Sequence, residues 1–455
     1  MITAEEISLA GKCIAFALEN GASAARAYLN KCTTDSYTIL NGELDKVTHS
    51  ADRSVYIYIF ADGRYGTFST NRLEERELED FVVKAIGMVR MLGEDRCRRL
   101  PDPGRTAKDA KTGRELDLYD ESYETLDAQT RLDHAMSLSI WEKIKESDGD
   151  YRIISEECEF SCTTDDSYTV DSQGFEGRHT ETSFGTFSEM TIEDKEGCKY
   201  SGYWWQSTPK MADLDLTGCG EKALERAARQ IGPKKRRSGK YRMIVDTTVA
   251  SRLVSPLISA LNASAIQQKM SFLEGSEGRK VFHEGMTLKD LARTPGKNGS
   301  RLFDTEGVAT SDSVVIENGV VKQYFTNTYM SEKMGIRPTV EDISRPCMMP
   351  YIKGRDLVSE EKEVSLEDIM RMTGNGILVT GFNGGNCNPV TGDFSFGIEG
   401  FAFAKGKVTH PVREMLITGN IKDLWNHLTA VGSDARASSR WQIPSLAFED
   451  VVFSA

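Results

Sequence analysis

A short motif occurs twice in the first half of this chain and limits the folds that the chain can adopt. It reads CTTDSYT at positions 32–38 and CTTDDSYT at positions 162–169. Each copy continues through a glycine-containing turn into a polar strand and an aromatic-containing strand, which is the pattern of antiparallel hairpins. We therefore expect an internally duplicated unit of one helix and antiparallel strands, with both copies paired in a single sheet. Chance similarity between two strands rich in threonine, serine and tyrosine is the alternative.

Apolar periodicity and turn signals predict the other elements. Amphipathic spacing predicts helices over 4–20, 73–92, 125–145, 217–230 and 247–268. Strands are expected over 36–40, 43–48, 54–60, 241–245, 313–316, 320–325, 401–404 and 407–408, the last two joined by a turn at 405–406.

The linker at 232–239, which combines glycine, proline and basic residues, separates two parts of the chain. A chain of 455 residues is long for one hydrophobic core. Helices with antiparallel hairpins, and few strand–helix–strand alternations, are typical of the α+β class. We predict two domains: 1–232, which carries the duplicated unit, and 240–455, which is mainly antiparallel β with an opening helix.

Composition excludes several functional classes. The net charge of −13 argues against direct nucleic-acid binding, and the basic run at 234–237 is interpreted as a solvated turn. No apolar run approaches the ~20 residues of a membrane span, and the acidic N-terminus does not resemble a secretory signal. Nine cysteines without a C-x-x-C pair indicate neither a disulfide framework nor a zinc knuckle. A cytoplasmic protein is expected.

The densest group of glycines and asparagines, GFNGGNCNPVTGD, fills positions 381–393 between two predicted strands. Glycine and asparagine reach positive-φ conformations, and loops on rigid strands often carry function. We interpret this stretch as a substrate-binding loop formed by Asn383, Gly384, Gly385, Asn386, Asn388, Gly392 and Asp393. The alternative is a long hairpin turn, in which Asp393 would cap the backbone of its own turn.

Four segments carry a resemblance to a known family: TDSYTILNGELDKV, YFTNTYMSEKMG, NPVTGDFSFGIEGF and SSRWQIPSLAFEDVVF. With them the chain resembles the TldD/PmbA family, the "modulator of DNA gyrase" proteins, and in particular its PmbA (TldE) branch. The resemblance covers nearly the whole chain. It implies a two-domain α+β protein related to metalloproteases.

The catalytic branch of that family carries an H-E-x-x-x-H motif on the helix that opens the C-terminal domain, where two imidazoles bind zinc and the glutamate activates water. The corresponding stretch here, 251–275, has no histidine and no acid before Glu274. The pair His283–Glu284 has no second histidine at the usual spacing, and the C-terminal tail lacks the cysteine ligand of that branch. The six histidines are scattered singly, so only a site assembled across the fold stays open.

The resemblance therefore implies a subunit without a catalytic residue, a metal or another cofactor of its own. Zinc is expected in a TldD-type metalloprotease partner, with which this chain would form a heterodimer around unfolded peptides; a homodimer is also open. Peptide would add to a strand edge beside the 381–393 stretch, with Tyr203, Trp204 and Trp205 either lining the groove or packed in the core.

Two other functions compete with this one. A stand-alone hydrolase with a nonlocal site could use Cys387, but a cysteine nucleophile needs a lowered pKa and a partner base, and nothing near it in sequence supplies one. A regulatory protein that binds a topoisomerase is the third reading, and the acidic charge permits protein contact rather than DNA contact.

Overall fold

The computed structural model describes residues 1–145, 150–354 and 363–455. They form two compact units. The first comprises 1–225, 292–311 and 326–341, and the second comprises 226–291, 312–325 and 342–455. Segments 292–311 and 326–341 thus group with the first unit, although both lie within the sequence range expected for the second domain. Backbone pairing explains part of this, because Thr106 forms a bridge with Val308 and the Ala107 amide donates to Gly307.

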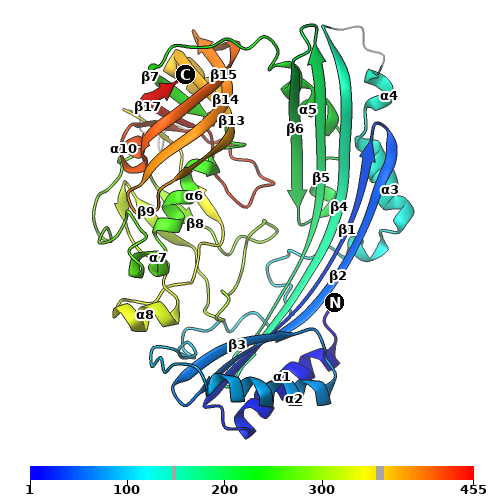
Figure 1. Ribbon diagram of the computed structural model, residues 1–455, viewed down its shortest axis with the longest axis vertical. Helices are drawn as coiled ribbons and strands as arrows, with labels where there is room; N and C mark the ends of the chain where they lie inside the picture. The colour runs from blue at the N-terminus through cyan, green and yellow to red at the C-terminus, as the bar shows by residue number, and fades with distance from the viewer. Residues whose placement is uncertain (146–149, 355–362) are drawn as a thin grey trace. The chain divides into compact units, whose positions relative to one another are not determined.

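The first unit is built on a six-stranded antiparallel sheet in the order β3-β2-β1-β4-β5-β6. Its long strands run side by side in Figure 1. The strands are β1 (Ala24–Leu40), β2 (Glu43–Ala61), β3 (Arg64–Thr70), β4 (Tyr151–Asp171), β5 (Glu176–Asp194) and β6 (Lys199–Thr208).

The repeated motif lies at the centre of this sheet. Each copy starts one three-stranded meander, and the two meanders meet where β1 pairs antiparallel with β4. Thr34 lies opposite Thr163, and their hydroxyl oxygens are 3.0 Å apart. The predicted pairing of both copies in one sheet is confirmed.

The strands are longer than the sequence predicts. Segments 43–48 and 54–60 were expected as separate strands, but both belong to β2. The polar residues between them stay in the ladder because each pairs with β1; Ser50, for example, lies opposite Thr34. A polar stretch is therefore not necessarily a loop, because a neighbouring strand can form hydrogen bonds with its backbone N–H and C=O groups.

The helices α1 (Ala4–Glu19), α2 (Glu75–Val89) and α3 (Ala128–Leu138) pack on parts of this sheet. The first unit also contains η1 (Glu121–Thr125), α4 (Trp141–Ile144), η2 (Met211–Asp213), α8 (Thr328–Met334) and the start of α5 (Cys219–Ala228). The helix expected over 125–145 is interrupted, because the buried Glu156 carboxylate accepts hydrogen bonds from the Ile140 and Trp141 amides at 2.8 and 3.1 Å.

The second unit contains a seven-stranded sheet in the order β12-β16-β17-β15-β14-β13-β7. Strand β17 also pairs with β7, so five of these strands close into a ring. The members are β7 (Gly239–Val245), β12 (Tyr351–Ile352), β13 (Asn375–Cys387), β14 (Asp393–Ala404), β15 (Lys407–Asn420), β16 (Leu428–Val431) and β17 (Leu446–Ser454). A small sheet joins β8 (Leu288–Asp290), β9 (Ser313–Glu317), β10 (Val320–Val321) and β11 (Pro346–Met348).

The helices that lie wholly in the described part of the second unit are α6 (Ser251–Ala260), α7 (Ala263–Gln267), α9 (Leu366–Thr373) and α10 (Ile421–Asn426). The single helix predicted over 247–268 is divided into α6 and α7. Backbone hydrogen bonds to Phe325 from both sides of Asn262 hold that residue extended, and its side chain caps α7 through the Ser264 amide at 2.9 Å.

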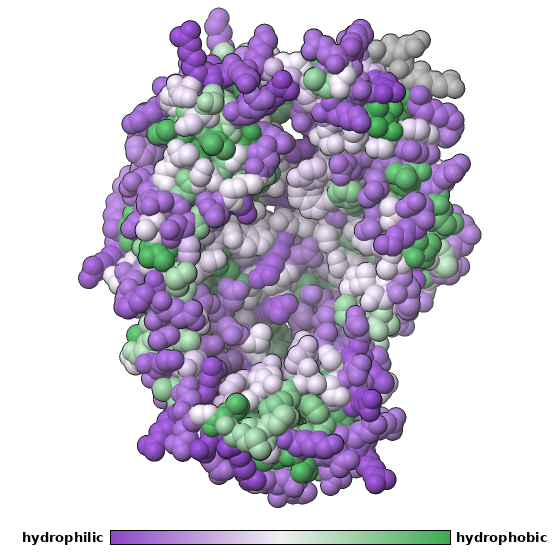
Figure 2. All heavy atoms as spheres, viewed as in Figure 1, coloured by the Kyte–Doolittle hydropathy of each residue, from purple (hydrophilic) through white to green (hydrophobic). Residues whose placement is uncertain are grey.

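The mixture of helices and mainly antiparallel sheets confirms the predicted α+β class. The face drawn in Figure 2 is largely hydrophilic, with hydrophobic residues in separate patches. Among the helices of the described residues, none has the length and apolar character needed to cross a bilayer.

Candidate functional site

The glycine- and asparagine-rich stretch is mainly strand. The sequence indicates a loop from position 381, but β13 remains paired with β14 as far as Cys387, and only 388–392 form the turn. The ladder tolerates this composition because its register shifts between Val379 and Gly381 and again between Phe382 and Gly385. Such bulges accommodate extra residues without ending the pairing.

One glycine in this stretch is required by the backbone of the next strand. Gly385 has a φ of +83°, and a Cβ there would lie 1.9 Å from the Ser395 carbonyl oxygen. Its neighbour Gly384 has a φ of +84° but has open space where a Cβ would be. Gly385 therefore allows the two strands to approach closely, whereas at Gly384 glycine is favoured only by the positive φ.

The predicted residues at the turn bond mostly to each other. The Asn388 amide donates to the Asp393 carbonyl at 2.7 Å, and the Gly392 amide donates to the Asn388 carbonyl at 2.8 Å. The Asp393 carboxylate accepts from Thr391 Oγ1 at 2.8 Å and from Asn420 Nδ2 at 3.0 Å. Hydrogen bonds from Asn420 and Thr391 lower the pKa of Asp393. The geometry matches the alternative in which this carboxylate stabilises its own turn.

A cavity of about 490 Å³ opens between this hairpin and α6, within the second unit. Its walls are Arg252, Ser255, Pro256, Ser259, Ala260, Ala265, Gln268, Met270, Phe272, Asn386, Cys387, Pro389 and Phe396. Two of the residues named from sequence, Asn386 and Cys387, lie in the wall. The others in the hairpin are close in the chain but are not in the wall: Asn383, Gly384, Gly385, Asn388, Gly392 and Asp393. The Asn383 amide instead donates to Glu399 at 3.2 Å.

Helix α6 presents one face to the cavity and buries the other. Leu253 and Leu257 are fully buried, and the Leu253 carbonyl accepts a hydrogen bond from the Trp425 indole at 3.3 Å. Ser255 and Ser259 are exposed on the opposite face. This amphipathic spacing fixes which side chains can reach the cavity.

Arg252 is the charged residue of the cavity wall and was missed by the sequence analysis. Its Nη2 donates to the Gly385 carbonyl at 2.9 Å, and its guanidinium carbon lies 5.1 Å from the centre of the Phe396 ring. In the sequence, the sign of this residue is a single arginine on a helix face whose other polar residues are serines.

The donor set of this cavity does not fit zinc. A zinc site uses imidazole, thiolate or carboxylate ligands, usually three or four, whereas this wall offers one thiol, several hydroxyls and amides, and a cation. Across residues 1–145, 150–354 and 363–455, no group of three or more His, Cys, Asp or Glu side chains could hold a metal ion. His283 is also engaged elsewhere: its Nδ1 accepts from the Gly285 amide at 3.0 Å.

Cys387 has the opposite environment to an activated nucleophile. Burial raises the pKa of its thiol, and the nearby Asp393 carboxylate raises it further. Within the described residues, the hydrogen bond of its thiol is a long one, 3.9 Å from Sγ to the Asn388 carbonyl oxygen. A thiol rather than a thiolate is therefore favoured at neutral pH.

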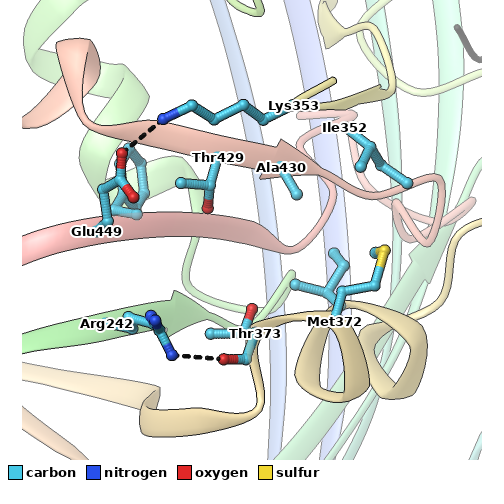
Figure 3. Close-up of a pocket in the computed structure, with 10 residues that line it drawn as sticks. Arg242, Ile352, Lys353, Met372, Thr373, Thr429, Ala430 and Glu449 are labelled. Atoms are coloured by element: carbon cyan, nitrogen blue, oxygen red, sulfur yellow. Dashed lines mark hydrogen bonds and ion pairs between the residues drawn. The ribbon is translucent and has the colours of Figure 1, made fainter. Parts of the chain in front are cut away.

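Two other cavities are lined by groups that already pair with protein. Figure 3 shows one of about 260 Å³ in the second unit, where Lys353 bonds Glu449 at 2.7 Å and Arg242 donates to the Thr373 carbonyl at 3.0 Å. Another, of about 580 Å³ in the first unit, contains the ion pair between Arg99 and Glu332.

The aromatic run on β6 is split between the two sides of its strand. Trp204 packs on the core cluster that contains Phe160 and Phe184. Tyr203 is 42% exposed, and its ring centre lies 5.7 Å from that of Trp205. None of these three residues lines the three cavities described above.

Three domains of one metallopeptidase family match this chain in the same order along the sequence. The PmbA/TldA metallopeptidase domain 1 matches residues 25–89, the central domain of that family matches 122–231, and its C-terminal domain matches 238–455. The chain belongs to the PmbA/TldA metallopeptidase family, and the family resemblance seen in the sequence is confirmed.

Individual relatives are similar to this chain over nearly its whole length. A crystal structure of a proposed modulator of DNA gyrase from Bacteroides thetaiotaomicron is 40% identical, covers 100% of both chains and superposes with a TM-score of 0.93. The metalloprotease PmbA of Escherichia coli O157:H7 is 26% identical over 93% of this chain and 90% of its own length. The structure of TldE from Thermococcus kodakarensis, at 19% identity and a TM-score of 0.80, has the same fold over 98% of this chain.

Proposed function

We propose that this chain is a non-catalytic, PmbA/TldE-type subunit that holds unfolded peptide for a TldD-type metalloprotease partner. The zinc ion and its general base belong to the partner in this proposal. The observation that supports it is the polar face of α6, which presents Arg252, Ser255 and Ser259 to the cavity, whereas zinc sites use imidazole, thiolate or carboxylate ligands.

A strand edge beside the cavity supports the peptide-binding part. Strand β7 pairs with β13 only along Ile377–Val379. From Gly381 to Cys387, the ladder within the described part of the chain pairs β13 with β14 alone. Residues 383–386 are exposed. An extended peptide can add to such an edge through main-chain hydrogen bonds, which makes binding largely independent of side-chain sequence.

Zinc content and peptidase activity test the non-catalytic part. The purified chain alone is expected to bind less than stoichiometric zinc and to leave a flexible, casein-derived peptide intact. Mixing it with a TldD-type subunit from the same cells should give zinc-dependent cleavage. Stoichiometric zinc together with cleavage by the isolated chain would show that the proposal is wrong.

Affinity capture from a lysate of the source cells tests the partner. A tagged chain is expected to retain a TldD-type metalloprotease subunit. Retention of gyrase subunits instead would favour regulation of a topoisomerase, the role suggested by the description of the Bacteroides thetaiotaomicron relative. Self-association alone, seen as a dimer by light scattering, would replace the heterodimer with a homodimer.

A further inference from the structure

The cavity between α6 and the β13–β14 hairpin has the size and lining of a site for one amino-acid residue. Its volume of about 490 Å³ falls within the range of small-molecule pockets. Much of its wall is apolar: Pro256, Ala260, Ala265, Met270, Phe272, Pro389 and Phe396. Methionine adapts its shape to different apolar groups. The wall therefore suits an apolar side chain without selecting a single type.

The charge of the wall comes from Arg252. No aspartate or glutamate lines the cavity, and within the described residues Arg252 forms no ion pair with an acid. A guanidinium carries five N–H donors in a planar fork, and one hydrogen bond, from Nη2 to the Gly385 carbonyl, accounts for part of that capacity. The cavity thus combines an apolar surface with a cation that lacks a counter-charge.

Contacts on two sides hold that cation in place. The hydrogen bond to Gly385 is 2.9 Å long, and the ring of Phe396 lies under the guanidinium at 5.1 Å. Phe396 is itself buried and stacks on Phe394 with ring centres 5.3 Å apart. A pre-positioned arginine favours planar, bidentate recognition of a carboxylate over a point-charge interaction.

We propose that this cavity binds the C-terminal residue of a peptide, with an apolar side chain among the aliphatic and aromatic wall residues and the free α-carboxylate on Arg252. The inference rests on the proposed peptide-binding function and specifies which part of the peptide is recognised. The edge of β13 that has no second strand partner within the described residues ends at Asn386 and Cys387, and both residues lie in the cavity wall. A peptide strand that follows this edge is therefore led to the cavity.

Matched peptides test the carboxylate directly. The probes are two fluorescein-labelled hexapeptides, five alanines followed by phenylalanine, that end in a free carboxylate or in a carboxamide. Fluorescence anisotropy with the full chain is expected to show at least tenfold tighter binding of the carboxylate form, as charge-assisted hydrogen bonds imply. Equal affinity of the two forms would overturn the inference while leaving peptide binding intact. No binding of either form would overturn the proposed peptide-binding function as well.

Arginine variants test the assignment to Arg252. Arg252→Gln should bring the carboxylate form down to the affinity of the carboxamide and leave the carboxamide unchanged, and Arg252→Lys should restore part of the difference. The control is Arg242→Gln, because Arg242 belongs to the same unit but donates to the Thr373 carbonyl in another cavity. An unchanged preference in Arg252→Gln, or an equal loss in Arg242→Gln, would contradict the assignment.

Cysteine protection supplies a readout that does not depend on any arginine variant. Cys387 lines the cavity, so the carboxylate peptide at saturation should slow its alkylation by iodoacetamide, as quantified by mass spectrometry of the fragment that contains it. Cys198, a partly buried cysteine of the first unit, serves as the internal control. Slowing at both cysteines, or at neither, would count against occupation of this cavity.

Discussion

Two long hairpins, β4–β5 in the first unit and β13–β14 in the second, differ in regularity. The β4–β5 ladder runs from Tyr151 to Val170 with one register shift near its start. The shorter β13–β14 ladder contains two shifts and includes Gly385, which cannot carry a side chain without a clash. A regular ladder fixes the face of every side chain and suits a scaffold. The irregular one leaves a backbone edge and a cavity wall, which suits a site.

Removing the buried charge of the regular hairpin should give the largest effect. Asp166 is 1% exposed and accepts hydrogen bonds from Arg178 Nε at 2.9 Å and from the Ile2 amide at 2.7 Å. Asp166→Ala leaves both donors without their acceptor and should cost about 3–5 kcal/mol of unfolding free energy. Urea unfolding, with hydrogen exchange of the β4–β5 amides to locate the change, measures it.

The matched control for that prediction is an exposed pair at the end of the same hairpin. Lys195 bonds Asp150 at 2.7 Å, and both side chains are largely exposed. Lys195→Ala should leave the urea midpoint unchanged, because water screens such pairs. If both variants behave alike, Asp166 does not anchor the regular hairpin.

Substituting one glycine in each hairpin tests the comparison itself. Gly385→Ala combines a positive φ with a Cβ 1.9 Å from a carbonyl oxygen, so the strands must separate, at a cost of about 2–3 kcal/mol. At Gly185 in β5, a Cβ would meet the Ser161 hydroxyl at 2.8 Å, and that group can rotate away. Gly185→Ala should therefore cost less than about 1 kcal/mol. Thermal unfolding and amide exchange of each hairpin report the difference.

Gly384→Ala distinguishes the cost of a positive φ from the cost of a steric clash within the irregular hairpin. Its φ is also positive, but no atom lies within 4 Å of the added Cβ, so a cost of about 1 kcal/mol is expected from conformation alone. A loss as large as that of Gly385→Ala would mean that backbone strain, rather than the close approach of β14, explains the glycine.

The centre of the duplicated sheet should show a smaller coupling. Thr34 and Thr163 face each other across the junction of the two meanders, with hydroxyl oxygens 3.0 Å apart. A double-mutant cycle with Thr34→Val and Thr163→Val is expected to give a coupling of about 0.2–1 kcal/mol. Zero coupling would mean that the junction is held by backbone hydrogen bonds alone.

These differences also explain what the sequence could predict. The repeated CTTD motif predicts the sheet of the first unit because both copies obey the same alternation, and the structure pairs them at Thr34 and Thr163. The strand lengths were underestimated, since polar residues such as Ser50 are satisfied by a neighbouring strand that no local pattern reveals. In the same way, α6 ends because Leu261 and Ala263, on either side of Asn262, form backbone hydrogen bonds with Phe325, which is distant in sequence.

The site was only partly predictable. Glycine density identified the hairpin and, through Asn386 and Cys387, two residues of the cavity wall. It could not distinguish Gly385, where another strand approaches, from Gly384, where none does. Arg252 and Phe396 escaped notice because their meeting depends on how α6 packs against β13 and β14, and a single arginine on a helix is ordinary in sequence.

The smallest expected effect concerns the reactivity of Cys387 in the irregular hairpin. Its pKa is raised first by burial and then by Asp393, so the thiolate fraction at pH 8 should be below that of a free cysteine. Iodoacetamide should therefore alkylate it slowly, and the rate should rise further at pH values where a free cysteine has already reached its plateau. Asp393→Asn removes the repelling charge and should increase the rate modestly, whereas Asp423→Asn, at an exposed position on α10, should not. If Cys387 in the unmutated chain is instead alkylated near pH 7 as fast as free cysteine or faster, its thiolate is activated. That result would favour the alternative function, a hydrolase with Cys387 as its nucleophile.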